Sequence, residues 1–353
     1  MTPTSLAKSL ATAAAAAFVL AAAPASGQEA ANVVKSGDYT LELPRGLKAD
    51  GAWIPANNPL SVAKVELGKL LYFDPRLSKD ATVSCASCHN PFHGFTDPAP
   101  TSKGVGGALG GRNSPTVINR LFSKEQFWDG RAADLEEQAK GPITNPVEMA
   151  MPSHDVAVKN IKAIRGYEPY FVKAFGDNKV DIDRISQAIA SYERTVVSGD
   201  SPYDRYLAGQ TDAMSGAAVR GMGVFLGKGR CITCHVGQNF TDEKYHNLGV
   251  GMDAEKPDLG RYEITKQESD KGAFKTPGLR NIADQAPYMH DGSERTLREV
   301  MELYNRGGVK NQWLSPLIQP LNLSEQEIDD LVAFMYALSG TVTNAEPPAA
   351  LPQ

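Results

Sequence analysis

The sequence of 353 residues predicts an all-α protein built from two related domains. Two copies of the string Cys-x-x-Cys-His begin at Cys85 and Cys231, far enough apart to leave each copy enough chain for a domain of its own. The segments that follow the two copies also repeat each other. Apolar residues recur at helical spacing, and no stretch shows the strict alternation typical of a sheet.

The two strings hold all four cysteines of the chain, and each matches the attachment pattern of a c-type haem. Two thiols three residues apart on a helical turn can both reach the vinyl groups of one porphyrin, and the next histidine then lies under the iron. A redox pair does not need that histidine, a zinc site would be short of nearby ligands, and short disulfides are the remaining alternative. We therefore expect two covalent c-type haems, bound through Cys85, Cys88, His89, Cys231, Cys234 and His235.

The two halves share one gapless register, which we call the duplication register. It pairs Pro115, Asn119, Asp129, Gly130 and Leu135 of the first half with Pro277, Asn281, Asp291, Gly292 and Leu297 of the second. Such a register indicates an internal duplication. We expect two cytochrome c-like domains, each wrapping one haem, at 29–205 and 206–342, followed by a disordered tail over 343–353 that is rich in Pro and Ala.

Two helices can be assigned from local patterns. Apolar residues recur at helical spacing from Ile182 to Val196. Ser324 and Glu327 form a capping box that opens a second helix, and Gly340 ends it. The connecting loops are rich in Gly and Pro, as expected where a haem supplies part of the core.

The segment 1–28 has the features of a signal peptide. Lys8 is its only charge, an Ala-rich apolar run extends from Leu10 to Ala23, and small residues follow as a cleavage site. The run is shorter than the ~20 residues that span a bilayer, so we expect export to the periplasm without membrane insertion after cleavage. A net charge of -5 and a pI near 5.8 argue against nucleic acid as a partner.

The sixth iron ligand decides what each haem can do, because a filled position transfers electrons and an open one binds a substrate. Met301 and Tyr304 lie on one face of a predicted helix, and either could bind the second iron; Met252, Met289 and His246 are further candidates. In the duplication register, Tyr304 corresponds to Pro142, which has no donor atom. The first haem is therefore expected to be open, and Glu148 could move protons beside it, or could form a surface salt bridge instead.

From about Leu67 to Gly340 the chain resembles the bacterial diheme cytochrome c peroxidase superfamily. The resemblance rests on the strings Phe73-Asp74-Pro75-Arg76-Leu77-Ser78, Arg112-Asn113-Ser114-Pro115-Thr116-Val117, Phe127-Trp128-Asp129-Gly130-Arg131 and Pro287-Tyr288-Met289-His290-Asp291-Gly292, together with Gln138, Gly141-Pro142 and Glu148. It implies an enzyme of the peroxidase class that acts on hydrogen peroxide.

The resemblance also implies roles for individual residues. Trp128 corresponds to the tryptophan between the two haems, through which they share charge. Gln138, Pro142 and Glu148 correspond to the peroxide pocket, with Glu148 as acid-base catalyst. A calcium ion between the domains is implied at Asn113 and at the backbone carbonyls of Gln285 and Pro287.

Two departures from the typical peroxidases point to the MauG-like branch of the superfamily. Val105 stands where a histidine normally caps the peroxide-binding iron, and His93 follows His89 too closely to replace it. Tyr304 stands where the second iron normally has a methionine, with Met301 as the rival ligand. An anionic oxygen ligand favours higher iron oxidation states, whereas a thioether raises the reduction potential. The branch thus implies an open first haem and a high-valent diheme state.

Three functions are consistent with the residues. The first is MauG-like oxidation of a partner protein or substrate by hydrogen peroxide. The second is reduction of hydrogen peroxide to water with electrons from a small c-type cytochrome or cupredoxin. The third is a non-enzymatic electron carrier with both irons capped. Many members of the superfamily dimerise, so a homodimer is a further candidate assembly.

Overall fold

The computed structural model describes residues 32–353. The predicted signal peptide (1–28) lies outside these residues. Within the described part, the chain is mostly helical, and none of its helices is both long and apolar enough to cross a membrane.

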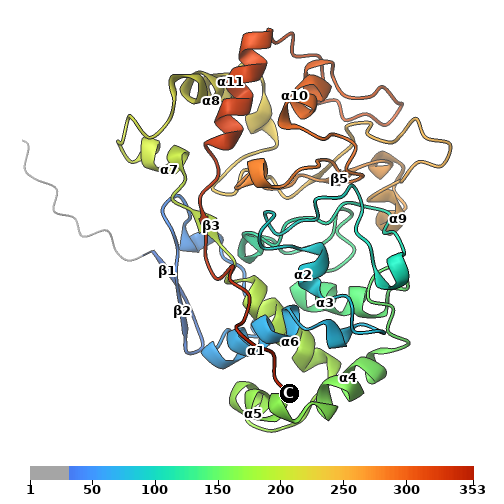
Figure 1. Cartoon of the computed structure of the whole chain (residues 1–353). Helices are drawn as coiled ribbons and strands as arrows, with labels where there is room; N and C mark the ends of the chain where they lie inside the picture. The colour runs from blue at the N-terminus through green and yellow to red at the C-terminus, as the bar shows by residue number, and fades with distance from the viewer. Residues whose placement is uncertain (1–31) are drawn as a thin grey trace, which may run out of the picture. The chain divides into compact units, whose positions relative to one another are not determined.

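The helices and strands have the following bounds, and Figure 1 shows their arrangement. The α-helices are α1 (Val62–Tyr72), α2 (Cys85–Cys88), α3 (Leu135–Thr144), α4 (His154–Ala163), α5 (Glu168–Phe175), α6 (Ile182–Glu193), α7 (Pro202–Leu207), α8 (Gly216–Leu226), α9 (Tyr262–Thr265), α10 (Leu297–Asn305) and α11 (Glu325–Tyr336). The strands are β1 (Val33–Ser36), β2 (Tyr39–Glu42), β3 (Ser198–Gly199), β4 (Tyr245–His246), β5 (Phe274–Lys275) and β6 (Thr341–Val342). Short 3₁₀ turns include Arg120–Phe122, Cys231–Thr233 and Ile282–Asp284.

The N-terminal half is organised by the crossing of α1 and α6 (Figure 1). The two backbones approach closely at Gly68, where a Cβ atom would lie 1.8 Å from the carbonyl oxygen of Ala188. The buried side chains of α6 include Ile185, Ile189 and Tyr192, as the helical spacing predicts. They join the core that α1, α3, α4 and α5 also build.

The C-terminal half repeats this design with α8 crossing α11. The close approach lies at Gly221, where a Cβ atom would be 1.9 Å from the carbonyl oxygen of Asp330. Phe225 of α8 and Phe334 of α11 pack edge to face at 5.2 Å. The capping box of Ser324 and Glu327 is present at the start of α11, so that prediction is confirmed. In Figure 1 this half, with α10, lies at one end of the described unit and α1, α5 and α6 lie at the other.

The backbone follows the predicted duplication register. Asn119 and Asn281 both adopt left-handed φ angles, 62° and 57°, immediately before equivalent 3₁₀ turns. Each asparagine side chain bonds the backbone N–H and carbonyl of one residue, Ser198 for Asn119 and Gly340 for Asn281. The β-bridge between Gln126 and Ala132 recurs in the same register between Tyr288 and Glu294.

Within residues 32–353, three antiparallel ladders of two strands each lie among the helices, and the sequence pattern did not predict them. Ladder β3–β6 pairs Ser198–Gly199 with Thr341–Val342 and so returns the chain end to the N-terminal half. Such short strands have too few residues to show an alternating pattern.

The C-terminal segment differs from the expected disordered tail. Gly166 donates a 2.7 Å hydrogen bond to the carbonyl of Gln353, and Arg76 donates one of 2.8 Å to the carbonyl of Pro352. Leu351 packs against the N-terminal core. A Pro- and Ala-rich composition lowers local order only where the segment finds no partner surface, and here the N-terminal half provides one.

Candidate active site

One cavity of about 700 Å³ is lined by both Cys-x-x-Cys-His strings. Its lining is mainly apolar and comes from both halves of the described chain. The predicted site residues Trp128, Gln138, Pro142 and Glu148 line it, and so do Met301 and Tyr304. The fold therefore brings together residues that lie far apart in the sequence.

The first Cys-x-x-Cys-His string is placed by α2. A capping box between Ser84 and Ser87 opens this helix, and the backbone N–H of His89 bonds the Cys85 carbonyl at 2.9 Å. The Tyr72 hydroxyl donates to the carbonyl of His89 at 2.9 Å, which fixes the backbone beneath the imidazole. Burial lowers the pKa of His89, so the imidazole is held in the neutral form that binds a metal.

The second string follows the same plan in the turn Cys231–Thr233. The N–H of His235 bonds the Cys231 carbonyl at 2.9 Å, and the His235 Nδ1 atom lies 2.9 Å from the Phe240 carbonyl oxygen. This contact assigns the ring proton to Nδ1 and leaves the Nε2 lone pair free for a metal. Burial lowers the pKa of His235 as well.

The thiols fit haem attachment better than the rival interpretations. No disulfide joins any two of the four cysteines, which argues against the interpretation of the strings as short disulfides. Burial raises the pKa of Cys85 well above its ordinary range and that of Cys88 to about 11, whereas a redox pair needs an accessible thiolate. Two thiol pairs and two neutral imidazoles around a largely apolar cavity are a donor set that suits two c-type haems.

Tyr304 and Met301 project from α10 into the cavity beside the second string. The Tyr304 hydroxyl makes no hydrogen bond with any described residue, and burial followed by the nearby thiols of Cys231 and Cys234 raises its pKa. Met301 is buried in the same wall. Of the further candidates, Met289 and His246 line the cavity and Met252 does not. The choice between Tyr304 and Met301 stays a prediction.

Glu148 lies in a short loop that follows α3. Asn145 donates a 2.8 Å hydrogen bond to the Glu148 carboxylate, and Val105 donates one of 2.8 Å to the Glu148 carbonyl. Burial raises the pKa of Glu148, an effect that Arg131 and Asn145 partly oppose. At Gly104 a Cβ atom would lie 2.4 Å from the Glu148 carbonyl oxygen, so the Gly-rich loop fits closely against this segment.

The other histidines of the N-terminal half, His93 and His154, make their contacts away from the cavity. His93 Nε2 lies 2.6 Å from the Ala286 carbonyl, and His93 does not line the cavity. His154 Nε2 contacts the Lys140 carbonyl. Among the described residues, His89 is the histidine of this half that lines the cavity.

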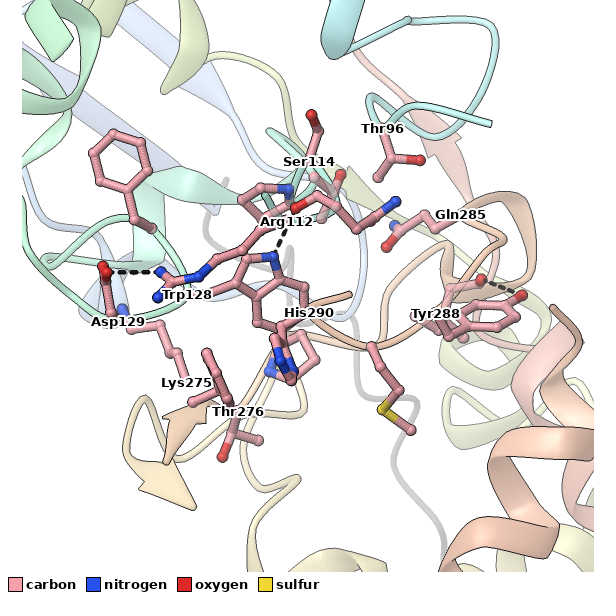
Figure 2. A pocket seen from close by; sticks show the side chains of 18 of the residues that line it. Thr96, Arg112, Ser114, Trp128, Asp129, Lys275, Thr276, Gln285, Tyr288 and His290 are labelled. Carbon is pink, nitrogen blue, oxygen red and sulfur yellow. Dashed lines mark hydrogen bonds and ion pairs between the residues drawn. The ribbon is translucent and has the colours of Figure 1, made fainter. Parts of the chain in front are cut away.

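The two halves meet at Trp128 (Figure 2). The indole Nε1 donates to the carbonyl of Asn113 at 2.8 Å, and the Asn113 N–H donates to the carbonyl of His290 at 2.7 Å. Arg112 joins the halves by hydrogen bonds to Asp129 at 2.6 Å and to Asp258 at 2.6 and 2.8 Å. The sequence patterns did not predict that Arg112 and His290 join the two halves. The duplication register could have indicated His290, because it pairs this residue with Trp128.

The three residues expected at a calcium site, Asn113, Gln285 and Pro287, all line the cavity. The Asn113 amide donates to the Ala99 carbonyl at 3.1 Å, and the Gln285 amide donates to the Arg280 carbonyl at 3.1 Å, so both side chains are already oriented by the backbone. Among the described residues, one cluster of three His, Cys or Asp/Glu side chains is close enough to bind a metal, and it lies elsewhere, at Cys234, Asp242 and His246.

Comparisons with known proteins agree with this geometry. Residues 62–212 match the family described as di-haem cytochrome c peroxidase, and residues 218–339 match the family described as cytochrome c. The chain is 42% identical to methylamine utilization protein MauG of Methylorubrum extorquens, over 85% of this chain and 83% of that protein. It is 40% identical to cytochrome c551 peroxidase of Nitrosomonas europaea, over 81% and 83%.

A solved structure described as a MauG-like protein associated with microbial copper homeostasis superposes with a TM-score of 0.76, at 32% identity, over 82% of this chain and 93% of that one. The relatives named here are peroxidases or MauG proteins, and the matched families are haem-binding. The chain is thus a haem enzyme of two cytochrome c-related domains, and it belongs to the di-haem cytochrome c peroxidase and MauG family.

Proposed function

We propose that this enzyme is a periplasmic diheme oxidoreductase that uses hydrogen peroxide to oxidise a partner protein or another substrate, as its MauG-named relatives suggest. One observation carries the proposal. Whichever of Met301 and Tyr304 binds the second iron, its counterpart in the first half is Ala139 or Pro142, and neither has a donor atom. Both counterparts line the cavity, so the first haem would keep an open side.

The haems would be attached through the two Cys-x-x-Cys-His strings. When bound, they would supply the iron at which the peroxide O–O bond is cleaved and would store the oxidising equivalents. His89 and His235 would each bind one iron as a neutral imidazole. Tyr304 would bind the second iron after losing its phenolic proton, which its raised pKa otherwise retains.

Glu148 would move the proton that O–O cleavage requires. Its carboxylate would take the proton from one peroxide oxygen and give it to the other, which leaves as water. Burial raises the Glu148 pKa toward neutrality, and Asn145 keeps the carboxylate oriented. Gln138, one turn before Pro142 on α3, would orient the peroxide through its side-chain amide.

Trp128 would let the second haem contribute one of the two electrons. The Trp128 carbonyl accepts a hydrogen bond from Lys275 of the other half, and the indole donates to Asn113, which itself bonds the other half. These contacts support a position of Trp128 between the haems. A calcium ion at Asn113, Gln285 and Pro287 would strengthen the same contact. We place the domain boundary near 205–206, and a homodimer is an assembly consistent with the family.

Electron paramagnetic resonance of the ferric holoenzyme tests the proposal. We expect one high-spin signal from the open haem and one low-spin signal from the six-coordinate haem, and both should change after one equivalent of peroxide. Two low-spin signals that peroxide leaves unaltered would reject the open site and favour an electron carrier.

A second function is reduction of peroxide to water with electrons from a c-type cytochrome or cupredoxin. The 40% identity to a protein named cytochrome c551 peroxidase favours it. Steady-state turnover separates the two functions. Rapid peroxide consumption with a reduced small cytochrome indicates the peroxidase, and slow consumption with covalent change in a partner protein indicates the MauG-like enzyme.

A further inference from the structure

Glu193, the last residue of α6, is a buried acid to which the proposed mechanism gives no task. The residue is 5% exposed and lines the same cavity as Cys85 and His89. Its carboxyl group has charged neighbours but no hydrogen-bond partner among the described residues. A buried carboxyl group without a partner favours its neutral form, because desolvation penalises the charge.

The cations near Glu193 do not pair with it. The guanidinium of Arg194, which is fully buried, makes two hydrogen bonds to the Glu136 carboxylate, at 2.6 and 2.8 Å. Arg120 lines the cavity from the turn Arg120–Phe122, and its buried Nε atom has no partner among the described residues. Arg194 and Arg120 therefore act on the Glu193 carboxyl group through their charge, and neither makes a hydrogen bond to it among the described residues.

Burial raises the pKa of Glu193 to about 8. Arg194 and Arg120 lower this pKa and Glu136 raises it, but burial is the largest effect.

The other groups that face the Glu193 carboxyl are Tyr72 from α1, Tyr192 from α6 and Cys85 from α2. The pKa of each of these three lies far above its ordinary value, so they stay neutral. Within this group, the charge that can change near neutral pH is that of Glu193.

We propose that Glu193 binds a proton when the haem on His89 is reduced and releases it when that haem is oxidised. The inference rests on the proposed attachment of that haem to Cys85 and Cys88. For each electron that a one-electron donor protein delivers to the ferric iron, one proton from solvent adds to the Glu193 carboxylate. Return of the electron from the haem to the donor protein would release the proton from Glu193 to solvent, and no other bond would change.

Electrostatics sets the direction of this coupling. Ferric iron carries one more positive charge than ferrous iron and so favours the carboxylate, whereas reduction favours the neutral acid. Burial, followed by the charge of Glu193, raises the pKa of the free Cys85 thiol, so the Glu193 carboxyl group lies near the residue to which the haem would be attached. The coupling is strong in a buried wall because water screens it poorly.

Redox titration of the first haem between pH 6 and pH 9 tests the proposal. In the wild-type holoenzyme the reduction potential should fall as pH rises through the region near 8, by at most about 59 mV per pH unit. This limit applies because a tenfold change in proton concentration shifts the potential of a one-electron couple by about 59 mV when one proton is bound. Glu193→Gln should abolish the slope. Glu66→Gln, the same change at an exposed position of α1, should retain it.

Redox-induced infrared difference spectra identify the group directly. A band from a protonated carboxyl group should appear on reduction in wild type and Glu66→Gln and be missing in Glu193→Gln. A potential independent of pH in wild type, or an unchanged slope in Glu193→Gln, would overturn the proposal. Glu193→Asp, which keeps a carboxyl group, should keep a slope if the Gln variant does not accumulate.

Haem content and peroxide consumption, measured on the same preparations, separate the two proposals. Suppose that both proteins carry two haems and that Glu193→Gln loses the pH dependence of the reduction potential. If wild-type protein then fails to consume peroxide, the proposed function is rejected and the role of Glu193 is retained.

Discussion

Trp128 and His290 occupy equivalent positions in the two halves, and each accepts a backbone hydrogen bond from the opposite half. The Lys275 N–H donates to the Trp128 carbonyl at 2.8 Å, and the Asn113 N–H donates to the His290 carbonyl at 2.7 Å. Lys275 and Asn113 are themselves equivalent in the duplication register. The contact between the halves therefore includes a symmetric pair of main-chain bonds. The Trp128 indole, shown in Figure 2, adds its own hydrogen bond to the Asn113 carbonyl.

Arg112 adds a side-chain link to this contact, so Arg112→Gln should weaken it. The change removes hydrogen bonds to Asp129 and Asp258 and leaves the buried Asp129 with Arg131 alone. We expect a loss of about 1 to 3 kcal/mol in the free energy of unfolding. Denaturant unfolding measures it, with Arg45→Gln at an exposed position as the control. Equal stability of the two variants would contradict the role of Arg112.

The docked C-terminal segment should stabilise the N-terminal half. Leu351→Asp places a charge against the core, and we expect a loss of about 1 to 2 kcal/mol. The melting temperature should then fall by about 2 to 4 °C per kcal/mol. Ala350→Asp introduces the same side chain one residue away at an exposed position and should have little effect. Identical melting curves for both variants would show that the segment does not contribute.

Sequence patterns predicted the parts of the fold that local chemistry determines. The Ser324 capping box, the apolar face of α6 and the duplicated register depend on residues close together in the chain or on a direct repeat of them, and the structure contains all three. The docked tail depends on a distant surface, which composition does not reveal. Glu193 and Arg120 were missed for the same reason, because only the packing of α6 and the 3₁₀ turn around the cavity gives these charges their environment.

Glu148→Gln should slow peroxide consumption by about 10²- to 10⁴-fold, the usual contribution of a general acid-base residue. Glutamine keeps the size of the side chain and can still bond Asn145, but it cannot carry the proton. Both haems should remain attached, as haem content and absorbance would show. Glu66→Gln is again the matched control. A wild-type rate in Glu148→Gln would reject the proton-transfer role.

The pH dependence of peroxide consumption should also depend on the ionisation of Glu148. Glu148 acts first as a base, so kcat/KM should fall as pH drops through its pKa, which burial holds above the ordinary value of 4.5. The acidic limb should therefore lie closer to neutrality than an exposed glutamate would give. In Glu148→Gln the residual activity should lack this limb. An acidic limb that survives the substitution would belong to another group.

Tyr304→Phe tests the ligand of the second haem. Removal of the hydroxyl should convert that haem from low spin to high spin, whereas Met301→Leu should leave its spectrum unchanged. Tyr336→Phe, at an exposed tyrosine of α11, is the control for the loss of a hydroxyl. The opposite pattern, a change in Met301→Leu alone, would identify a thioether ligand. Because a thioether raises the reduction potential, that result would favour a peroxidase that accepts electrons from a small redox protein over a MauG-like enzyme.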